Sequence, residues 1–217
     1  MHIQSAVDRL NRQLPLKARQ EQLSPALKKL HQTILYSLAR QGTVPTTDML
    51  TEQVGQTTLT TAIQTLAAQD LIVLNDSASE VVGAYPLTTE VTPHRLQIGA
   101  HSLYAMCALD AVSVAPMFAT EVRIDSHCHV TGHAVQIHMR GADVIASNPA
   151  ELMIGIRWQM PSGVAAHSMC TEMVFLKDSK TARQWQGDEV ENISLFSLAE
   201  AIEFGRAFFM PLLSNDY

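Results

Sequence analysis

The spacing of apolar side chains changes near residue 70, and this change constrains the fold more than any other feature of the chain. Before it, Leu30, Ile34 and Leu38 recur every four residues, which is close to the period of an α-helix with one buried face. After it, residues 120–126 and 134–139 alternate between apolar and polar in the manner of half-buried strands. The pattern therefore predicts an α+β protein whose first part is helical.

The first 85 residues are expected to form three helices and a hairpin. Ser24 is a good N-cap, Pro25 suits the first helical position, and Gly42 follows the end of this helix. A short second helix should begin after Thr46 or Thr47. The third helix is expected from about 58 to 69, and strands are expected over 70–74 and 81–85.

Three helices and a hairpin resemble a winged helix, which usually places its third helix in a DNA groove. Here the third helix contains neither Lys nor Arg between residues 57 and 69. A structural three-helix module is therefore favoured over DNA binding, and docking of a partner protein is left as an alternative.

The second part is expected to be a mixed, mainly antiparallel β core with flanking helices. We divide the chain into a winged-helix-like module at 1–85 and an α+β domain at 86–217, with a linker from Pro86 to about Pro93. Strands are expected at 95–98, 120–126, 134–139, 153–158 and 171–176. One helix is expected from His101 to about Ser113, with Pro116 as its boundary, and another from Ser197 to about Phe209.

Composition limits the kinds of function that this chain can have. Of its 217 residues, 47% are apolar, which is enough for a substantial core, and no apolar run approaches the roughly 20 residues of a membrane span. The net charge of −6 disfavours non-specific binding of nucleic acid. Three cysteines and no visible signal peptide favour free thiols in a cytoplasmic protein.

Two thiols and one carboxyl are the candidates for chemistry. On a helix, Cys107 and Asp110 would lie three residues apart and share a face, which places a soft metal ligand beside a proton carrier. Cys170 follows a glycine-containing loop, a common position for functional groups. From spacing alone, all three residues could equally be structural.

A zinc site at His127, Cys128, His129 and His133 is the weaker alternative. In a strand, His127 and His129 share one face while Cys128 points to the other, and none of the usual zinc spacings is present. A buried structural Cys128 beside partly exposed histidines is favoured instead.

Three blocks of the second part together resemble the organomercurial (alkylmercury) lyases. They are the run from Leu103 to Asp110 (LYAMCALD), the run from Arg123 to Cys128 (RIDSHC) with Thr131-Gly132 after it, and the run from His167 to Cys170 (HSMC). The resemblance covers roughly residues 80 to 210, with the blocks in order. The helical first part also agrees with the winged-helix-like first part of that family.

The resemblance implies a site and a reaction. Cys107 and Cys170 would be the catalytic cysteines that bind mercury, and Asp110 beside them would be both the catalytic aspartate and a further mercury ligand. Cys128 would be a structural cysteine. The reaction would be protonolysis of a carbon–mercury bond, which gives a hydrocarbon and Hg(II) held by the two thiols. No organic cofactor is expected. The expected partners are an organomercurial substrate, excess low-molecular-weight thiol and a mercuric reductase as acceptor of Hg(II). Binding to nucleic acid or to a membrane is not expected.

Two positions depart from the family's pattern. Family members often carry Trp directly before the first cysteine, where this chain has Met106, and some carry a further cysteine where it has Thr171. The first change could alter the pocket, and the second argues against an accessory thiol there. A protein that binds or senses a soft metal without catalysis, on the same winged-helix-like frame, remains the alternative function.

Overall fold

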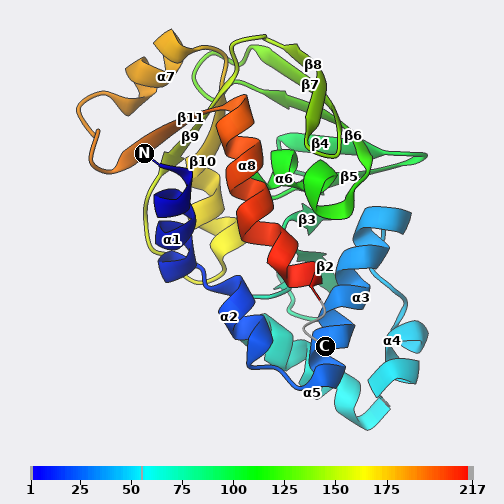
Figure 1. Cartoon of the computed structure of the whole chain (residues 1–217). Coiled ribbons are helices and arrows are strands. Elements are labelled where there is room, and N and C mark those ends of the chain that lie inside the picture. The colour runs from blue at the N-terminus through cyan, green and yellow to red at the C-terminus, as the bar shows by residue number, and fades with distance from the viewer. Residues whose placement is uncertain (1, 55, 215–217) are drawn as a thin grey trace.

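The computed structural model describes residues 2–54 and 56–214, and its helices and strands are labelled in Figure 1. The helices are α1 (Ile3–Gln13), α2 (Leu16–Glu21), α3 (Pro25–Gln41), α4 (Thr47–Val54), α5 (Gln56–Ala68), α6 (Ala108–Phe118), α7 (Ser179–Gln186) and α8 (Leu198–Phe209). The strands are β1 (Val73–Leu74), β2 (Val81–Ala84), β3 (Leu87–Thr88), β4 (His94–Ile98), β5 (His101–Ala105), β6 (Glu121–His127), β7 (Ala134–Arg140), β8 (Asp143–Asn148), β9 (Met153–Arg157), β10 (Met173–Leu176) and β11 (Ile193–Ser197). Short 3₁₀ turns are η1 (Ala165–His167), η2 (Met169–Glu172) and η3 (Met210–Leu213).

The strands form two sheets. The large sheet has eight strands in the order β1-β2-β3-β5-β4-β6-β7-β8, and the small sheet has three in the order β10-β9-β11. All pairings among the described strands are antiparallel. The predicted mixture of helices with a mainly antiparallel β core is thus confirmed.

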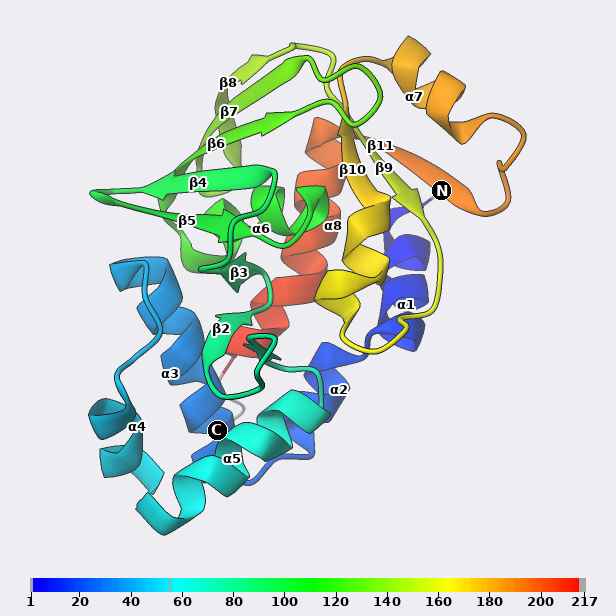
Figure 2. The same ribbon diagram turned by 180° about the vertical axis from the view of Figure 1, so that it is seen from behind.

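Helix α6 lies at the centre of the layers. It packs against strands of the large sheet on one side and against α8 on the other, and α1 packs on α8 in turn (Figures 1 and 2). The crossing of α6 and α8 is close, because a Cβ on Gly205 would clash with the Oγ of Ser113. All residues from Ala108 to Met117 are buried, so α6 can present groups only to the interior.

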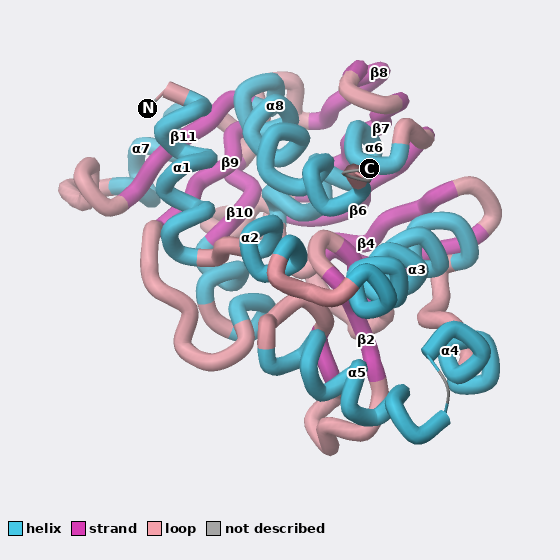
Figure 3. The backbone as a smooth tube through the Cα atoms, turned by 60° about the horizontal axis from the view of Figure 1, so that its bottom comes forward, coloured by secondary structure: helices cyan, strands magenta, loops and turns pink. Residues whose placement is uncertain are grey.

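Three helices of the first part, α3, α4 and α5, follow the sequence prediction, whereas α1 and α2 precede them and were not predicted. Ser24 caps α3 by accepting a hydrogen bond from the N–H of Leu27 at 3.4 Å, and Gly42 ends the helix with a left-handed φ of 72°. Strand β2 runs between α3 and α5 (Figure 3). The expected hairpin is present, although β1 contains only two residues.

The large sheet continues through the boundary that we expected at residue 85. Strand β2 pairs with β3, and β3 pairs with β5, so part of the expected linker is itself a strand. Buried residues of both parts belong to one apolar cluster. The prediction of a linker over 86–93 is therefore wrong for β3, while the division into two domains stays a prediction.

The helix predicted from His101 to Ser113 is wrong in its first half. His101–Ala105 is strand β5, which pairs with β4 after a turn in which Gly99 has a φ of 55°. Leu103 and Ala105 face the core while Tyr104 between them is only partly buried, so the same apolar residues fit a strand as well as a helix. Helix α6 then begins at Ala108 and continues past Pro116 to Phe118.

Other differences concern short elements. Strand β10 begins at Met173 and not at Thr171, and the pattern did not indicate β8, α7 or β11. Among the described residues, no helix combines the length and the apolar character needed to cross a bilayer.

Candidate active site

Cys107 occupies the N-cap of α6. Its backbone is extended, with φ of −151° and ψ of 179°, and its Sγ accepts a hydrogen bond from the N–H of Asp110 at 3.3 Å. The thiol is thus at the positive end of a helix dipole, where a thiolate is stabilised. Burial has the larger effect, however, and together with the Cys170 hydrogen bond and the Asp110 charge it raises the pKa of Cys107 well above its usual value.

Asp110 lies in the first turn of α6 with its side chain fully enclosed. It is 1% exposed, and its Oδ2 is buried without a hydrogen-bond partner in the structure. Burial raises the pKa of Asp110 to about 7, and hydrogen bonds with Cys107 act in the opposite direction. A carboxyl group with such a pKa can accept and donate a proton near neutral pH.

Cys170 lies in η2, within the segment that connects strands β9 and β10 of the small sheet. It is 4% exposed and follows the loop that contains Gly163. The hydrogen bond with Cys107 lowers the pKa of Cys170, but burial and the charges of Asp110 and Asp70 outweigh it and leave the pKa raised.

The three groups converge. The sulfur atoms of Cys107 and Cys170 and a carboxylate oxygen of Asp110 all lie within 4.8 Å of one another. Among the residues that the structure describes, no other group of three His, Cys, Asp or Glu side chains is close enough to hold a metal ion together. Two thiols and one proton carrier therefore share a site that excludes water.

Two side chains of the first part hold the turn that precedes Cys170. The hydroxyl of Tyr85 donates to Oδ1 of Asp70 at 2.9 Å and accepts the N–H of Ala166 at 2.9 Å. Oδ2 of Asp70 accepts the N–H of Ala165 at 3.1 Å. We call this pair the Asp70–Tyr85 clamp. The clamp fixes two successive N–H groups of η1, a few residues before the thiol.

A small pocket of about 170 Å³ leads to the site from the surface. Cys170 is among its lining residues, whereas Cys107 and Asp110 are not. The lining residues are Pro93, His94, Met106, His127, His129, Cys170, Thr171, Met173, Val174 and Phe175. Met106, which departs from the family's pattern, therefore borders the route to the thiols, and its methyl group packs close to Gly83.

A second methionine, Met173, contacts the thiol of Cys107 directly. The thiol of Cys107 donates to the Sδ of Met173 across 3.6 Å, and Met173 is only 3% exposed. Sequence reasoning did not single out Met173. It missed the clamp, because Asp70 and Tyr85 are far from Cys170 in sequence.

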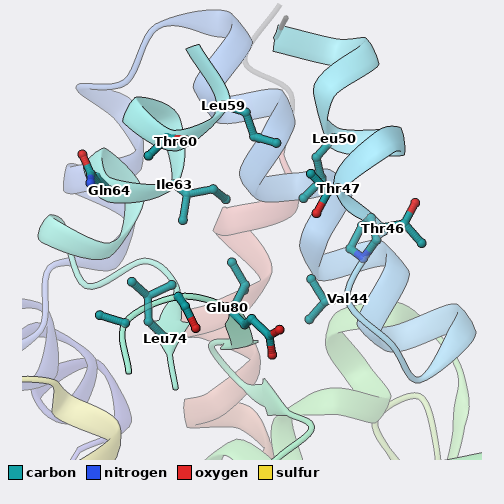
Figure 4. A pocket seen from close by; sticks show the side chains of 14 residues that line it. Val44, Thr46, Thr47, Leu50, Leu59, Thr60, Ile63, Gln64, Leu74 and Glu80 are labelled. Atoms are coloured by element: carbon teal, nitrogen blue, oxygen red, sulfur yellow. The ribbon is translucent and has the colours of Figure 1, made fainter. Parts of the chain in front are cut away.

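A larger pocket of about 410 Å³ lies away from the thiols, between α4, α5 and the β1–β2 hairpin (Figure 4). Leu50, Leu59 and Ile63 give it an apolar wall, and Glu80 lies at its edge. None of the three cysteines lines this pocket.

The histidines near Cys128 do not form a metal site. Cys128 is fully buried, and its Sγ accepts the N–H of Lys177 at 3.4 Å. Its backbone also bonds to the far end of the turn, where its carbonyl accepts from the N–H of Gly132 and its N–H donates to the carbonyl of His133. This arrangement joins the β6–β7 turn to the end of β10, which is the structural position expected for Cys128.

Comparison with known proteins places these residues within a family. The family model described as "MerB: Alkylmercury lyase" matches residues 87–210. An alkylmercury lyase of Staphylococcus epidermidis is 28% identical over 115 residues, which cover 53% of this chain and 53% of that protein. One of Bacillus cereus is 26% identical over 115 residues, covering 53% of this chain and 52% of that protein. The chain thus spans about half the length of the curated relatives it matches.

A solved structure has the same fold over almost the whole chain. The crystal structure of the mercury-bound form of MerB2 superposes with a TM-score of 0.77 and covers 92% of this chain and 98% of its own, at 23% identity. At this sequence identity, the similarity between the two structures establishes the shared fold alone. Because the family model covers more than half of the chain and includes Cys107, Asp110 and Cys170, the chain belongs to the alkylmercury lyase family.

Proposed function

We propose that this protein is an organomercurial lyase, which cleaves the carbon–mercury bond of alkyl- or arylmercury compounds by protonolysis. The observation that carries the proposal is the convergence of Cys107, Cys170 and Asp110 within 4.8 Å, inside the part that matches the family. Mercury is a soft ion that prefers thiolates, and the bond-breaking step needs a proton delivered to carbon. These three side chains supply both.

The proposed reaction uses the two thiols as proton sources and mercury ligands, and Asp110 transfers both protons. A substrate arrives as an organomercury thiolate, and one cysteine displaces the carried thiol while its proton passes through Asp110 to the departing sulfur. The second cysteine then bonds to mercury, and its proton passes through Asp110 to the carbon as the carbon–mercury bond breaks. The products are the hydrocarbon, the free thiol and Hg(II) bridged by Cys107 and Cys170, with Asp110 unchanged.

The site needs no organic cofactor for this sequence of steps, because both protons come from its own thiols. Release of Hg(II) does need external thiol, since two buried thiolates hold the ion strongly. A mercuric reductase is a fitting acceptor, and a cytoplasmic role in mercury detoxification and resistance fits free thiols.

We also infer that α3, α4, α5 and the β1–β2 hairpin form a winged-helix-like module with a structural role. The order of elements supports the comparison, and the absence of Lys and Arg from the described residues of α5 argues against DNA binding. Its hairpin adds two strands to the large sheet, which gives the module a clear structural task.

The decisive experiment is to incubate the purified protein with an arylmercurial and excess thiol and to measure the arene released. We expect turnover well above the thiol-only control. Asp110→Asn should still bind mercury but lose roughly a hundredfold or more in rate, as expected for removal of a positioned acid–base group. Arene release no faster than the control would refute the lyase, and full activity of Asp110→Asn would remove Asp110 from the mechanism.

A further inference from the structure

Met173 places a third sulfur atom at the site. Its thioether lies 3.6 Å from the Sγ of Cys107, and the same residue lines the entry pocket together with Cys170. A thioether is a soft, uncharged metal ligand. One soft ion bound to Cys107 would therefore have this sulfur beside it.

We propose that Met173 is a third sulfur ligand for mercury, whose Sδ binds the ion alongside the two thiolates. This inference rests on the proposed function, because it takes Hg(II) or an organomercurial as the occupant of the site. It adds a residue to the pair of thiols and the carboxyl without changing their roles.

The charge of the site favours an uncharged third ligand. Two thiolates neutralise one Hg(II) ion, and a further anionic ligand would leave net negative charge in a buried place, which is costly. Cys107, Asp110 and Met173 are all at most 3% exposed. A thioether can donate electron density without bringing charge, and it leaves Asp110 free to carry the proton.

The backbone holds Met173 in a fixed relation to Cys170. The N–H of Met173 donates to the carbonyl of Cys170, which closes η2. Met173 then begins β10 and pairs with Ile156 of β9. The thioether is thus carried by a sheet and not by a free loop, so little ordering is needed when mercury binds.

A third donor has two effects on the proposed reaction. A sulfur lone pair shared with mercury raises electron density on the bonded carbon and makes the carbon easier to protonate. After cleavage, the same bond slows the departure of Hg(II). No proton is gained or lost by Met173 in either step.

The test uses the full chain and mercuric ion alone as the probe. Met173→Leu conserves volume and costs less than about 1.5 kcal/mol in a core, so the variant should fold. We expect it to release Hg(II) to an added dithiol roughly tenfold faster than the wild type, the order of effect that supporting groups have on metal sites. Met117→Leu, a buried change in the last turn of α6, is the matched control and should release at the wild-type rate.

A second measurement detects the bond itself. In protein with isotopically labelled methionine methyl groups, the Met173 methyl resonance should split by coupling to the spin-half isotope of mercury, and the split signal should be missing in Met173→Leu. Unchanged release by Met173→Leu, or a Met173 methyl without coupling, would overturn the proposal. Both readouts follow Hg(II) binding and not turnover, so failure of the lyase reaction would be seen separately, in the arene assay.

Discussion

Opposing effects act on the pKa of the Asp110 carboxyl group. The first turn of a helix favours negative charge, as do hydrogen bonds from Cys107, whereas complete burial disfavours it. Burial has the larger effect and raises the pKa of Asp110 to about 7. A carboxyl group, which is exposed in most proteins, can thus exchange a proton near neutral pH here because α6 is enclosed on every side.

The raised pKa of Asp110 should make stability depend on pH. The native state binds this proton more tightly than the unfolded chain, so its contribution is full at low pH and is lost as pH rises to about 7. A pKa of about 7 in place of the usual 3.8 corresponds to about 4 kcal/mol in the free energy of unfolding. The free energy of unfolding of Asp110→Asn, measured in urea, should therefore rise relative to wild type between about pH 4 and pH 8. If the difference in the free energy of unfolding between the two proteins stayed constant over this range, the pKa of Asp110 would not be raised.

The segment before Cys170 shows how one element positions another. The N–H groups of Ala165 and Ala166 in η1 are bound by the Asp70–Tyr85 clamp, whose residues follow α5 and β2. Loops are usually the mobile parts of a fold. Here a buried tyrosine and a half-buried aspartate hold the turn that leads to the thiol.

Removal of the Tyr85 hydroxyl should therefore weaken the part of mercury binding that depends on Cys170. Tyr85→Phe leaves the N–H of Ala166 without its acceptor, which costs about 1–3 kcal/mol if the group stays buried. We expect Hg(II) to be released to a dithiol up to roughly tenfold faster, because about 1.4 kcal/mol is a factor of ten. Capture of an organomercurial by Cys107 alone should persist.

Tyr104→Phe, a change in strand β5 of the large sheet, is the control for the loss of a phenol hydroxyl. If Tyr85→Phe and Tyr104→Phe released Hg(II) at the same rate, the clamp would have no positioning role.

The sequence predicted these elements unequally. Caps and periodicity were enough for α3 and α8, because Ser24 and Ser197 each cap a helix through local hydrogen bonds. The segment at His101 fits both periods, and only its pairing with β4 makes it a strand. The identity of the site residues followed from their motifs, but their convergence and the position of Met173 depend on contacts between distant segments, which local patterns do not encode.

At the scale of the whole molecule, one sheet links the two parts of the chain. Strands β1 and β2 belong to the first 85 residues, and the other six strands of the large sheet to the rest. Buried residues of both parts form a single apolar cluster. A core of this kind favours unfolding in one transition.

We expect the two parts to lose structure together in urea. Both tryptophans, Trp158 and Trp185, lie in the second part, so their fluorescence follows mainly that part, with Arg9 of α1 packed over the Trp158 ring. Amide hydrogen exchange of α3 follows the first part. The two probes should give the same free energy of unfolding, and opening of α3 at a urea concentration that leaves the fluorescence unchanged would show independent domains.

The clamp also determines how much of the chain would have to be moved to transplant this chemistry. The family model begins at residue 87, after both Asp70 and Tyr85. A graft limited to 87–210 would carry both thiols and the carboxyl but would leave behind the two side chains that hold the Cys170 turn. For protein engineering, the smallest portable unit is therefore longer than its recognisable motifs, and it begins no later than Asp70, just after the end of α5.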